Sequence, residues 1–381
     1  MSGNFQYLIN PAAPLVVRSG VPFGSGVKPD GANFPLPSAI AGMVRTTVGI
    51  EKGLDFSSEH VKESLLAIQC KGPFLVTTLG GERQVCLPKP SDCYFVDGPH
   101  AKPQLIRLTP AELPEGAGCD LPPGLSPILP TVAAKGKPNA SMSRRYWSWP
   151  LFSDWLEGTE PEDQRLNSQT LNPPATVVRT HVAIDSVTQA AIAGKLFQTA
   201  AASYEQPLGS TSTPYIEGLA FWTNTALKGD SVCLGGERRL SRLHALDESE
   251  SFLPQITSRL LKQLIGATRF RLVFLTPGLL AAGAVPVPLG NAWRPLSDCP
   301  ELEVHVRAVA LSRMQAISGW DLAKGGPKAT RRAVPTGSVY WCEVATGLTE
   351  QQVNSLWFAA MSGEIQDSTD GFGVVVPGVW I

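Results

Sequence analysis

The segment TRFRLVFL, residues 268–275, alternates apolar and basic side chains along its length. In an extended chain, Phe270 and Leu272 fall on one face while Arg269 and Arg271 fall on the other, because successive side chains of a strand point to opposite faces. The alternation predicts a strand with one face toward an apolar core and a second, basic face that stays open. The fold follows from the elements that accompany this strand.

A second segment, ATVVRTHVAID (residues 175–185), shows the same alternation. Val178 and Val182 share one face of the predicted strand, and Arg179 and His181 share the other. The stretch QITSRLLKQLI, which lies between the two strands, has its apolar residues at helical spacing. An antiparallel sheet with helices on one face and an open, partly basic other face is the layout of a ferredoxin-like or RNA-recognition fold.

The first hundred residues predict the same layout again. Phe5, Tyr7 and Ile9 alternate as in a strand, and Ser38 stands where it can cap a helix that begins in FPLPSAIAGMVRT. A second short helix and the strand-like stretches PFLVTT, RQVCLP and DCYFVD follow. The predicted fold class is therefore α+β, with two tandem ferredoxin-like (RRM-like) domains.

Glycine and proline divide the chain. It holds 36 Gly and 33 Pro among 381 residues, which predicts many turns and long Gly/Pro-rich insertions. Between residues 111 and 174 the alternation gives way to Pro, Gly, Asn and Ser. We therefore predict an N-terminal domain over residues 1–110, an insertion or linker over 111–174, and a C-terminal domain over 175–381.

Composition limits the classes of function. The chain is 43% hydrophobic and 17% charged with a net charge of −1, so it predicts a globular protein that contacts polyanions through local basic patches. The seven cysteines contain no Cys-x-x-Cys pair, which favours free thiols in a reducing cytoplasm over a zinc site. We find neither an export signal nor a membrane span in the sequence, and predict a cytoplasmic location without membrane partners.

Catalytic signatures are missing from the sequence. It has no phosphate loop, His-Glu-x-x-His helix or nucleophile elbow. His181 and Asp185 lie four residues apart on a predicted strand, about 13 Å, and cannot touch directly. A catalytic His181 and a structural or RNA-contacting His181 both remain open.

Two basic segments and one aromatic cluster are candidates for binding. Clustered cations on Gly-rich loops suit a phosphate backbone, although an ordinary solvated loop has the same composition. Aromatic side chains beside arginines either stack on bases or bury in a partner interface. The basic residues are Lys324, Lys328, Arg331 and Arg332 in GWDLAKGGPKATRR, and Arg238 and Arg239 in LGGERR; the aromatic cluster comprises Arg144, Arg145, Tyr146, Trp147 and Trp149.

The stretch DGFG, residues 370–373, allows two interpretations. Its Asp-Gly-Phe-Gly order lacks the companion residues of a kinase metal loop. Glycines on both sides of Phe372 permit either a backbone cradle for phosphates or a turn into the last strand. We interpret Asp370 as a turn residue, for which Asp370→Asn costs little.

These pieces, taken in order, resemble one family. They are similar to the subunit of type III-B CRISPR effectors, in the repeat-associated mysterious protein superfamily, that caps the 5′ end of the guide RNA. The matching blocks are VRSGVPFGSG, FPLPSAIAGMVRT, LPKPSD, VVRTHVAIDSVTQAAIAGKLF, LGGERR, LTPG, SGWD with GGPKATRRAVPTGSVYW, and DGFG.

The resemblance implies two ferredoxin-like domains, a glycine-rich loop used against RNA, no cofactor and no nuclease activity of the subunit itself. Its implied partners are the repeat-derived 5′ tag of CRISPR RNA, a large polymerase/cyclase-like subunit, and a backbone subunit that cleaves target RNA. A metal-independent guide-processing endoribonuclease and a purely protein-binding scaffold remain alternatives. The implied RNA contacts are Arg18, Ser38, Arg45, Arg179, His181, Arg238, Arg239, Lys324, Lys328, Arg331, Arg332, Gly371, Phe372 and Gly373, and the aromatic cluster is the predicted partner interface.

Overall fold

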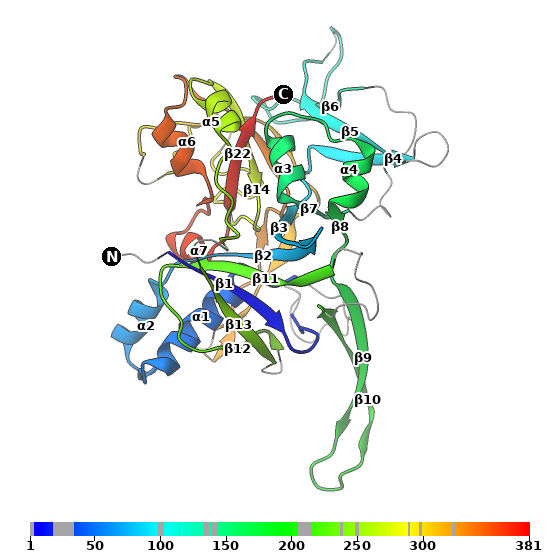
Figure 1. Cartoon of the computed structure of the whole chain (residues 1–381), viewed down its shortest axis with the longest axis vertical. Coiled ribbons are helices and arrows are strands. Elements are labelled where there is room, and N and C mark those ends of the chain that lie inside the picture. The colour runs from blue at the N-terminus through cyan, green and yellow to red at the C-terminus, as the bar shows by residue number, and fades with distance from the viewer. Residues whose placement is uncertain are drawn as a thin grey trace.

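A computed structural model describes residues 4–17, 34–97, 103–113, 115–132, 138, 144–204, 215–236, 239–247, 251–288, 290–296, 299–321 and 325–381. Two antiparallel sheets dominate these ranges, one crossing the middle of the view and one above it (Figure 1). A long hairpin projects away from both sheets. None of the helices in the described ranges has the length and apolar character needed to cross a membrane.

The first sheet combines segments from distant parts of the sequence. Its eight strands are, in spatial order, β12 (Ser231–Cys233), β13 (Leu240–Leu246), β1 (Phe5–Pro11), β11 (Tyr215–Thr223), β2 (Cys70–Leu79), β3 (Glu82–Pro88), β7 (Tyr146–Ser148) and β8 (Thr170–Leu171). The central pairings β1–β11 and β11–β2 are antiparallel. The strands that the sequence predicts near residues 5–9, 73–78 and 83–88 are confirmed.

Helix α1 (Pro37–Glu51) covers one face of this sheet. Its buried stripe includes Ile40, Val44 and Val48, which pack with Leu75 and other sheet residues. Proline at the first helical position suits this helix start, where its missing N–H is not needed. The N-cap is a leucine without a side-chain cap, so the predicted capping role of Ser38 is wrong.

The second sheet contains the segment TRFRLVFL at its centre. Its order is β15 (His305–Ala310), β20 (Val339–Glu343), β14 (Arg269–Phe274), β22 (Val374–Val379) and β21 (Ala359–Ala360), with every pairing antiparallel. Phe74 of the first sheet packs edge-on against Phe358 beside the second, with ring centroids 5.8 Å apart. One continuous apolar core therefore joins the two sheets.

The predicted open basic face of β14 is wrong. Five of its six residues are buried, including Arg271, whose side chain pairs with Asp92 and donates to the carbonyl of Trp155. Asp92 and Trp155 both belong to the long segment between β2 and β11, which covers this face. A buried arginine needs a carboxylate partner, and Asp92 provides it.

The predicted boundary near residue 174 does not separate the sheets. Strands β11 and β13, which follow residue 174, are the direct neighbours of β1 in the first sheet. The segment from β3 to β10 (Ala191–Ser203) is thus inserted between two neighbouring strands, β2 and β11. The predicted division into domains remains a prediction. Any such division must keep β11 and β13 in the same sheet as β1.

Strands β9 (Ala175–Ile184) and β10 (Ala191–Ser203) form a two-stranded hairpin that extends from the body of the molecule (Figure 1). The strand over 175–184 is confirmed, but its predicted apolar core face is wrong. Val178 and Val182 are 53% and 40% exposed, because the hairpin projects from the body of the molecule and its faces are open to solvent.

The remaining elements are short. Three small ribbons pair β4 (Cys93–Asp97) with β5 (Pro103–Pro110) and β6 (Ile128–Pro130), β16 (Gln315–Ile317) with β19 (Arg331–Ala333), and β17 (Trp320–Asp321) with β18 (Gly326–Pro327). The other helices are α2 (Glu59–Leu66), α3 (Trp149–Leu156), α4 (Asp163–Ser168), α5 (Ser258–Leu264), α6 (Glu350–Leu356) and α7 (Ile365–Asp370). Helices α2 and α5 confirm predicted helices.

Candidate nucleic-acid interface

A small apolar cluster joins three sequence blocks that lie far apart in the chain. Leu279, Ile317, Ala333 and Phe372 are buried together, and Leu36 packs against them. Leu36 precedes α1, Ile317 and Ala333 belong to the β16–β19 ribbon, and Phe372 belongs to DGFG. Folding therefore brings the start of α1, the basic ribbon and the DGFG turn to one place.

LGGERR and two segments that adjoin further blocks meet beside α1. Helix α1 contacts β12, and the glycines that follow β12 run along the N-terminal segment, where the amide of Gly236 donates to the carbonyl of Val16 at 2.7 Å. Leu15 and Ala202, at the base of the hairpin, exchange two backbone hydrogen bonds of 2.8 Å. We call the surface of the β9–β10 hairpin, the β16–β19 ribbon with the adjoining residues 325–330, and the junction residues Leu15, Val16, Ala202 and Gly236 the candidate interface.

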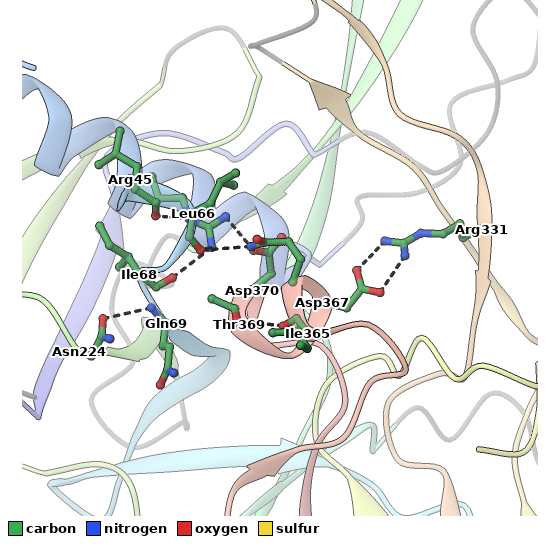
Figure 2. A network of polar contacts seen from close by, with 12 residues as sticks. Arg45, Leu66, Ile68, Gln69, Asn224, Arg331, Ile365, Asp367, Thr369 and Asp370 are labelled. Atoms are coloured by element: carbon green, nitrogen blue, oxygen red, sulfur yellow. Dashed lines mark hydrogen bonds and ion pairs between the residues drawn. The ribbon is translucent and has the colours of Figure 1, made fainter. Parts of the chain in front are cut away.

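Arg45 is a structural residue. Its guanidinium donates to the carbonyls of Leu65, Leu66 and Ile68 and forms an ion pair of 2.7 Å with Asp370 (Figure 2). The Arg45 side chain is 12% exposed and the Asp370 side chain 8%. The predicted RNA contact of Arg45 is wrong, because carbonyls at the end of α2 and just after it, together with Asp370 of α7, already use its donors.

Asp370 is the other half of that ion pair. It is the last residue of α7, and it also accepts a hydrogen bond of 2.8 Å from Gln366. The interpretation of Asp370 as a turn residue with little to lose is therefore wrong. The carboxylate ties α7, which belongs to the second half of the chain, to α1 in the first.

Arg331 is held by the same short helix. Its two terminal nitrogens donate to Asp367 at 2.8 and 2.7 Å, and Glu364 lies 3.7 Å away (Figure 2). These hydrogen bonds raise the pKa of Arg331, with the Asp367 charge adding to the effect. The fork of the guanidinium faces a carboxylate, so a phosphate contact by Arg331 would require exchange of that partner.

The DGFG turn has no free amide for a phosphate. The amides of Gly371, Phe372 and Gly373 donate to Ser368, Asp367 and Pro277, at 3.1, 2.9 and 2.8 Å, and all three residues are buried. The prediction that Gly371–Gly373 cradle RNA is wrong.

The glycines of this turn are needed for packing. Gly371 has φ +96°, and a Cβ there would lie 2.7 Å from the carbonyl oxygen of Cys70. Gly373 has φ +73° and a similarly close neighbour in Ser362. Only glycine meets both the conformation and the close approach.

Exposed cations of the candidate interface include Arg179 and Lys195 on the hairpin, Lys328 directly after β18, and Arg332 on β19. Ser38 and Arg239 are half-buried, and Arg239 is already engaged within the chain. Arg18, Arg238 and Lys324 lie outside the described residues. RNA contacts at Ser38, Arg179, His181, Arg239, Lys328 and Arg332 remain predictions.

An aromatic platform on the hairpin was not predicted. The ring of His181 stacks on Phe197 of the opposite strand, with centroids 5.2 Å apart and an interplanar angle of 17°. Its Nε2 lies 2.9 Å from the hydroxyl oxygen of Thr199, and Phe197 is 52% exposed. The register that pairs Phe197 with His181 comes from the two strands, and a single strand pattern does not reveal it.

Asp185 does not orient His181. It accepts hydrogen bonds from the amides of Val187 and Thr188 at 2.9 and 2.8 Å in the hairpin turn. Those amides, with that of Thr188 first, lower the pKa of the Asp185 carboxyl. Its role is to close the turn.

The aromatic-basic cluster is divided between core and surface. Trp147 is fully buried and packs edge-on against Trp155, so its predicted place in a partner interface is wrong. Trp149 and Tyr146 are half-buried, with Trp149 packed against Trp357, while Arg145 is exposed. Partner contacts by Arg144, Arg145, Tyr146 and Trp149 stay predictions.

Metal and thiol chemistry find little support in the described chain. Within it, no three His, Cys, Asp or Glu side chains gather in a way that could hold a metal ion. The seven cysteines are free thiols, five of them buried. Burial raises the pKa of Cys70 to about 12 and that of Cys93 to about 11, which keeps both protonated at neutral pH.

Comparison with known proteins gives one match over nearly the whole chain. Residues 7–380 match the family described as CRISPR-associated protein (Cas_Cmr3). No curated protein matches the chain.

Solved structures are more distant. A chain in the cryo-EM structure of the type III-B Cmr-beta bound to cognate target RNA and AMPPnP is 17% identical, with 88% of this chain and 86% of that chain covered and a TM-score of 0.45. A chain in the Csm3–Csm4 subcomplex of the type III-A CRISPR-Cas interference complex is 9% identical, with 91% and 95% covered and a TM-score of 0.38.

The family match spans every sequence block from which the resemblance was inferred, and it confirms that inference. The chain belongs to the Cas_Cmr3 family of CRISPR-associated proteins.

Proposed function

We propose that the chain is a non-catalytic subunit of a type III-B CRISPR effector complex that binds the 5′ repeat-derived tag of CRISPR RNA. The observation that carries this proposal is the convergence of the family-matching blocks on the candidate interface, where Arg179, Lys328 and Arg332 remain exposed. Phosphates of a single strand are held by such exposed cations, while unstacked bases pack on aromatic side chains.

The strand orders support a pair of ferredoxin-like units. In the first sheet β1, β2, β11 and β13, counted along the chain, lie in the order fourth, first, third, second, and α1 follows the first strand. In the second sheet β14, β15, β20 and β22 lie in the same order, and α6 and α7 precede the fourth strand. Each set is fully antiparallel, as the ferredoxin-like arrangement requires.

We do not assign RNA binding to the open sheet face expected of such units. The first sheet packs α1 on one face and the second sheet's core on the other, so neither face is free. We propose that the hairpin and the ribbon contact the RNA in place of an open sheet face. The stacked rings of His181 and Phe197 suit a base, since base–aromatic stacking contributes about 1–3 kcal/mol per base.

The surroundings of His181 give little support to a catalytic role for this residue. Acid–base cleavage of RNA needs a histidine within reach of the scissile phosphate. In the described chain the polar contact of the His181 ring is the hydroxyl of Thr199, and its flat face is covered by Phe197. This geometry supports a stacking role.

The proposed partners follow from the family. A large polymerase/cyclase-like subunit would dock on this chain, and a backbone subunit of the same superfamily would continue along the guide. Arg145 and Trp149 remain candidate contacts for a protein partner. We place the assembled ribonucleoprotein in the cytoplasm.

Crosslinking tests the RNA contact directly. The assembled complex is loaded with guide RNA that carries 4-thiouridine in its 5′ tag and is then irradiated. We expect adducts on peptides from the hairpin or the ribbon of this chain. A particle whose tag crosslinks other subunits alone would support the scaffold alternative.

Cleavage tests the absence of catalysis. The purified chain is incubated with repeat RNA in EDTA, and we expect intact RNA at all times. Site-specific cleavage that disappears in His181→Ala would establish the endoribonuclease alternative instead.

A further inference from the structure

A second cluster of charged residues lies at one end of the second sheet. Arg269, Glu343 and His305 are neighbours across three strands, because Arg269 and His305 are both paired with Glu343. Arg307, two residues further along β15, also reaches this carboxylate. None of these residues belongs to a block that we assign to tag binding.

Glu343 orients two guanidinium groups. Its Oε1 accepts from Nε of Arg269 at 3.1 Å, and its Oε2 accepts from Nε of Arg307 at 2.5 Å. The hydrogen bond from Arg307 is the main cause that lowers the pKa of Glu343, which keeps it ionised. The terminal nitrogens of both arginines make no hydrogen bond to any described residue, so their forks stay available for an anion.

The site carries an excess of one positive charge. Two arginines share a single carboxylate, and both remain accessible, with side-chain exposures of 60% for Arg269 and 42% for Arg307. The next ion pair along the chain, Arg294 with Glu303, is balanced by itself. A phosphate would therefore complete the charge balance at Arg307.

Arg307 also lines a cavity. The cavity has a volume of about 250 Å³, and its apolar walls include Val285, Val287, Pro288 and Val306. Asn291 also lines the cavity, and an asparagine amide can both donate and accept. The volume lies just below the range of about 300–1,000 Å³ that is typical of small-molecule sites, which limits the occupant to one compact unit.

We propose that this cavity binds one nucleoside phosphate, with the phosphate on the free fork of Arg307 and the nucleoside against the valine and proline walls. An acidic peptide side chain would use the arginine but would leave most of the apolar wall uncovered. A bare phosphate would leave all of it uncovered. The proposal does not depend on tag recognition, since it uses different residues.

Calorimetric titration of the full-length chain with adenosine 5′-monophosphate tests the proposal. We expect saturable binding of one molecule per chain. Arg307→Gln should weaken it by about tenfold or more, the effect of losing one charge-assisted forked contact. Arg307→Lys, which keeps the charge but not the fork, should recover only part of the loss.

The controls separate the cavity from general charge effects. Arg259→Gln removes another exposed arginine that pairs with a carboxylate, and should leave binding unchanged. Thermal unfolding of each variant shows that the fold is intact. Absence of saturable binding, equal losses in Arg307→Gln and Arg259→Gln, or inorganic phosphate binding as tightly as the nucleotide would each overturn the proposal.

Competition distinguishes the source of the nucleotide. If the cavity takes a residue of an RNA strand, a single-stranded pentaribonucleotide displaces adenosine 5′-monophosphate from the wild-type chain. If it takes a free nucleotide, the oligonucleotide does not compete. Both outcomes support a nucleoside phosphate site, and neither is affected if crosslinking to the tag fails.

Discussion

Asp370, Gly371 and Gly373 of DGFG have structural roles that the sequence does not predict. Asp370 is a buried ion-pair partner of Arg45, and the flanking glycines shape a turn whose amides bond within the protein. The sequence shows which residue types are present, but not that Arg45, more than 300 residues away, approaches Asp370. Contacts of such separation come from tertiary structure and leave no local pattern.

Asp370→Asn should destabilise the protein by about 1–3 kcal/mol, because it leaves the guanidinium of Arg45 buried with a neutral partner. Urea denaturation followed by fluorescence measures the loss. Glu364→Gln is the matched control: its side chain is 75% exposed and lies 3.7 Å from Arg331, so we expect a loss below about 1 kcal/mol. Equal effects of the two changes would contradict the structural role of Asp370.

Gly371→Ala should cost at least about 1–3 kcal/mol, because a left-handed conformation is strained for alanine and its Cβ would meet the carbonyl of Cys70 at 2.7 Å. Gly42→Ala, on α1 with no atom within 4 Å of its added Cβ, should be neutral or stabilising. The same denaturation experiment compares them. A stable Gly371→Ala protein would show that the turn is not constrained as described.

At the scale of elements, the strands and helices with strong periodicity are the ones that the sequence predicts well. Strands β1, β2, β3 and β14 and helices α1, α2 and α5 lie where alternation or helical spacing indicates. The burial of their faces is less predictable. Both faces of β14 are covered by parts of the chain distant in sequence, whereas β9 has the same pattern and is exposed on a free hairpin.

The hairpin should be dispensable for folding and required for RNA. Val178 and Ala200 are cross-strand partners, so an Asn-Gly turn can join them and replace residues 179–199. We expect a midpoint of thermal unfolding close to that of the full chain. Guide-RNA affinity of the assembled complex should fall by about tenfold or more, from the loss of base stacking.

Phe197→Ala tests with a single substitution whether the hairpin contributes to guide-RNA binding. It removes the ring on which His181 stacks, and the affinity should fall by about 1–3 kcal/mol for the base concerned. Val187→Ala changes a residue that is 88% exposed in the turn of the same hairpin and should have no effect. Filter binding compares the three proteins, and indistinguishable affinities would exclude the platform.

At the scale of the whole molecule, the sequence predicts the class of fold and the family, but not how the chain is threaded through its sheets. The mixed α and β character and the antiparallel pairing are confirmed. The predicted linker over 111–174 is part of a longer insertion between β2 and β11, which adds β3, β7 and β8 to one edge of the first sheet and covers one face of β14 in the second. Composition shows that this insertion is irregular, whereas its return into the same sheet depends on pairing between distant strands.

The same threading determines which predicted site residues stay available. The blocks converge because α1, α7 and the ribbon meet at the junction of the two sheets. There Arg45 and Arg331 form ion pairs with Asp370 and Asp367 of α7 and act as structural groups (Figure 2). Lys328, directly after β18, and Arg332, on β19, are exposed and therefore stay available. We expect these two cations to contact the phosphates of the guide.

The salt dependence of guide-RNA binding tests this claim most directly. For the complex assembled with Lys328→Glu/Arg332→Glu, the slope of log affinity against log salt should fall by about 0.7 for each lost phosphate contact, about 1.4 in total. Lys52→Glu/Lys262→Glu, which makes the same change of charge at exposed positions on other elements, should leave the slope unchanged. An unchanged slope in the ribbon variant, or an equal fall in both, would contradict the claim.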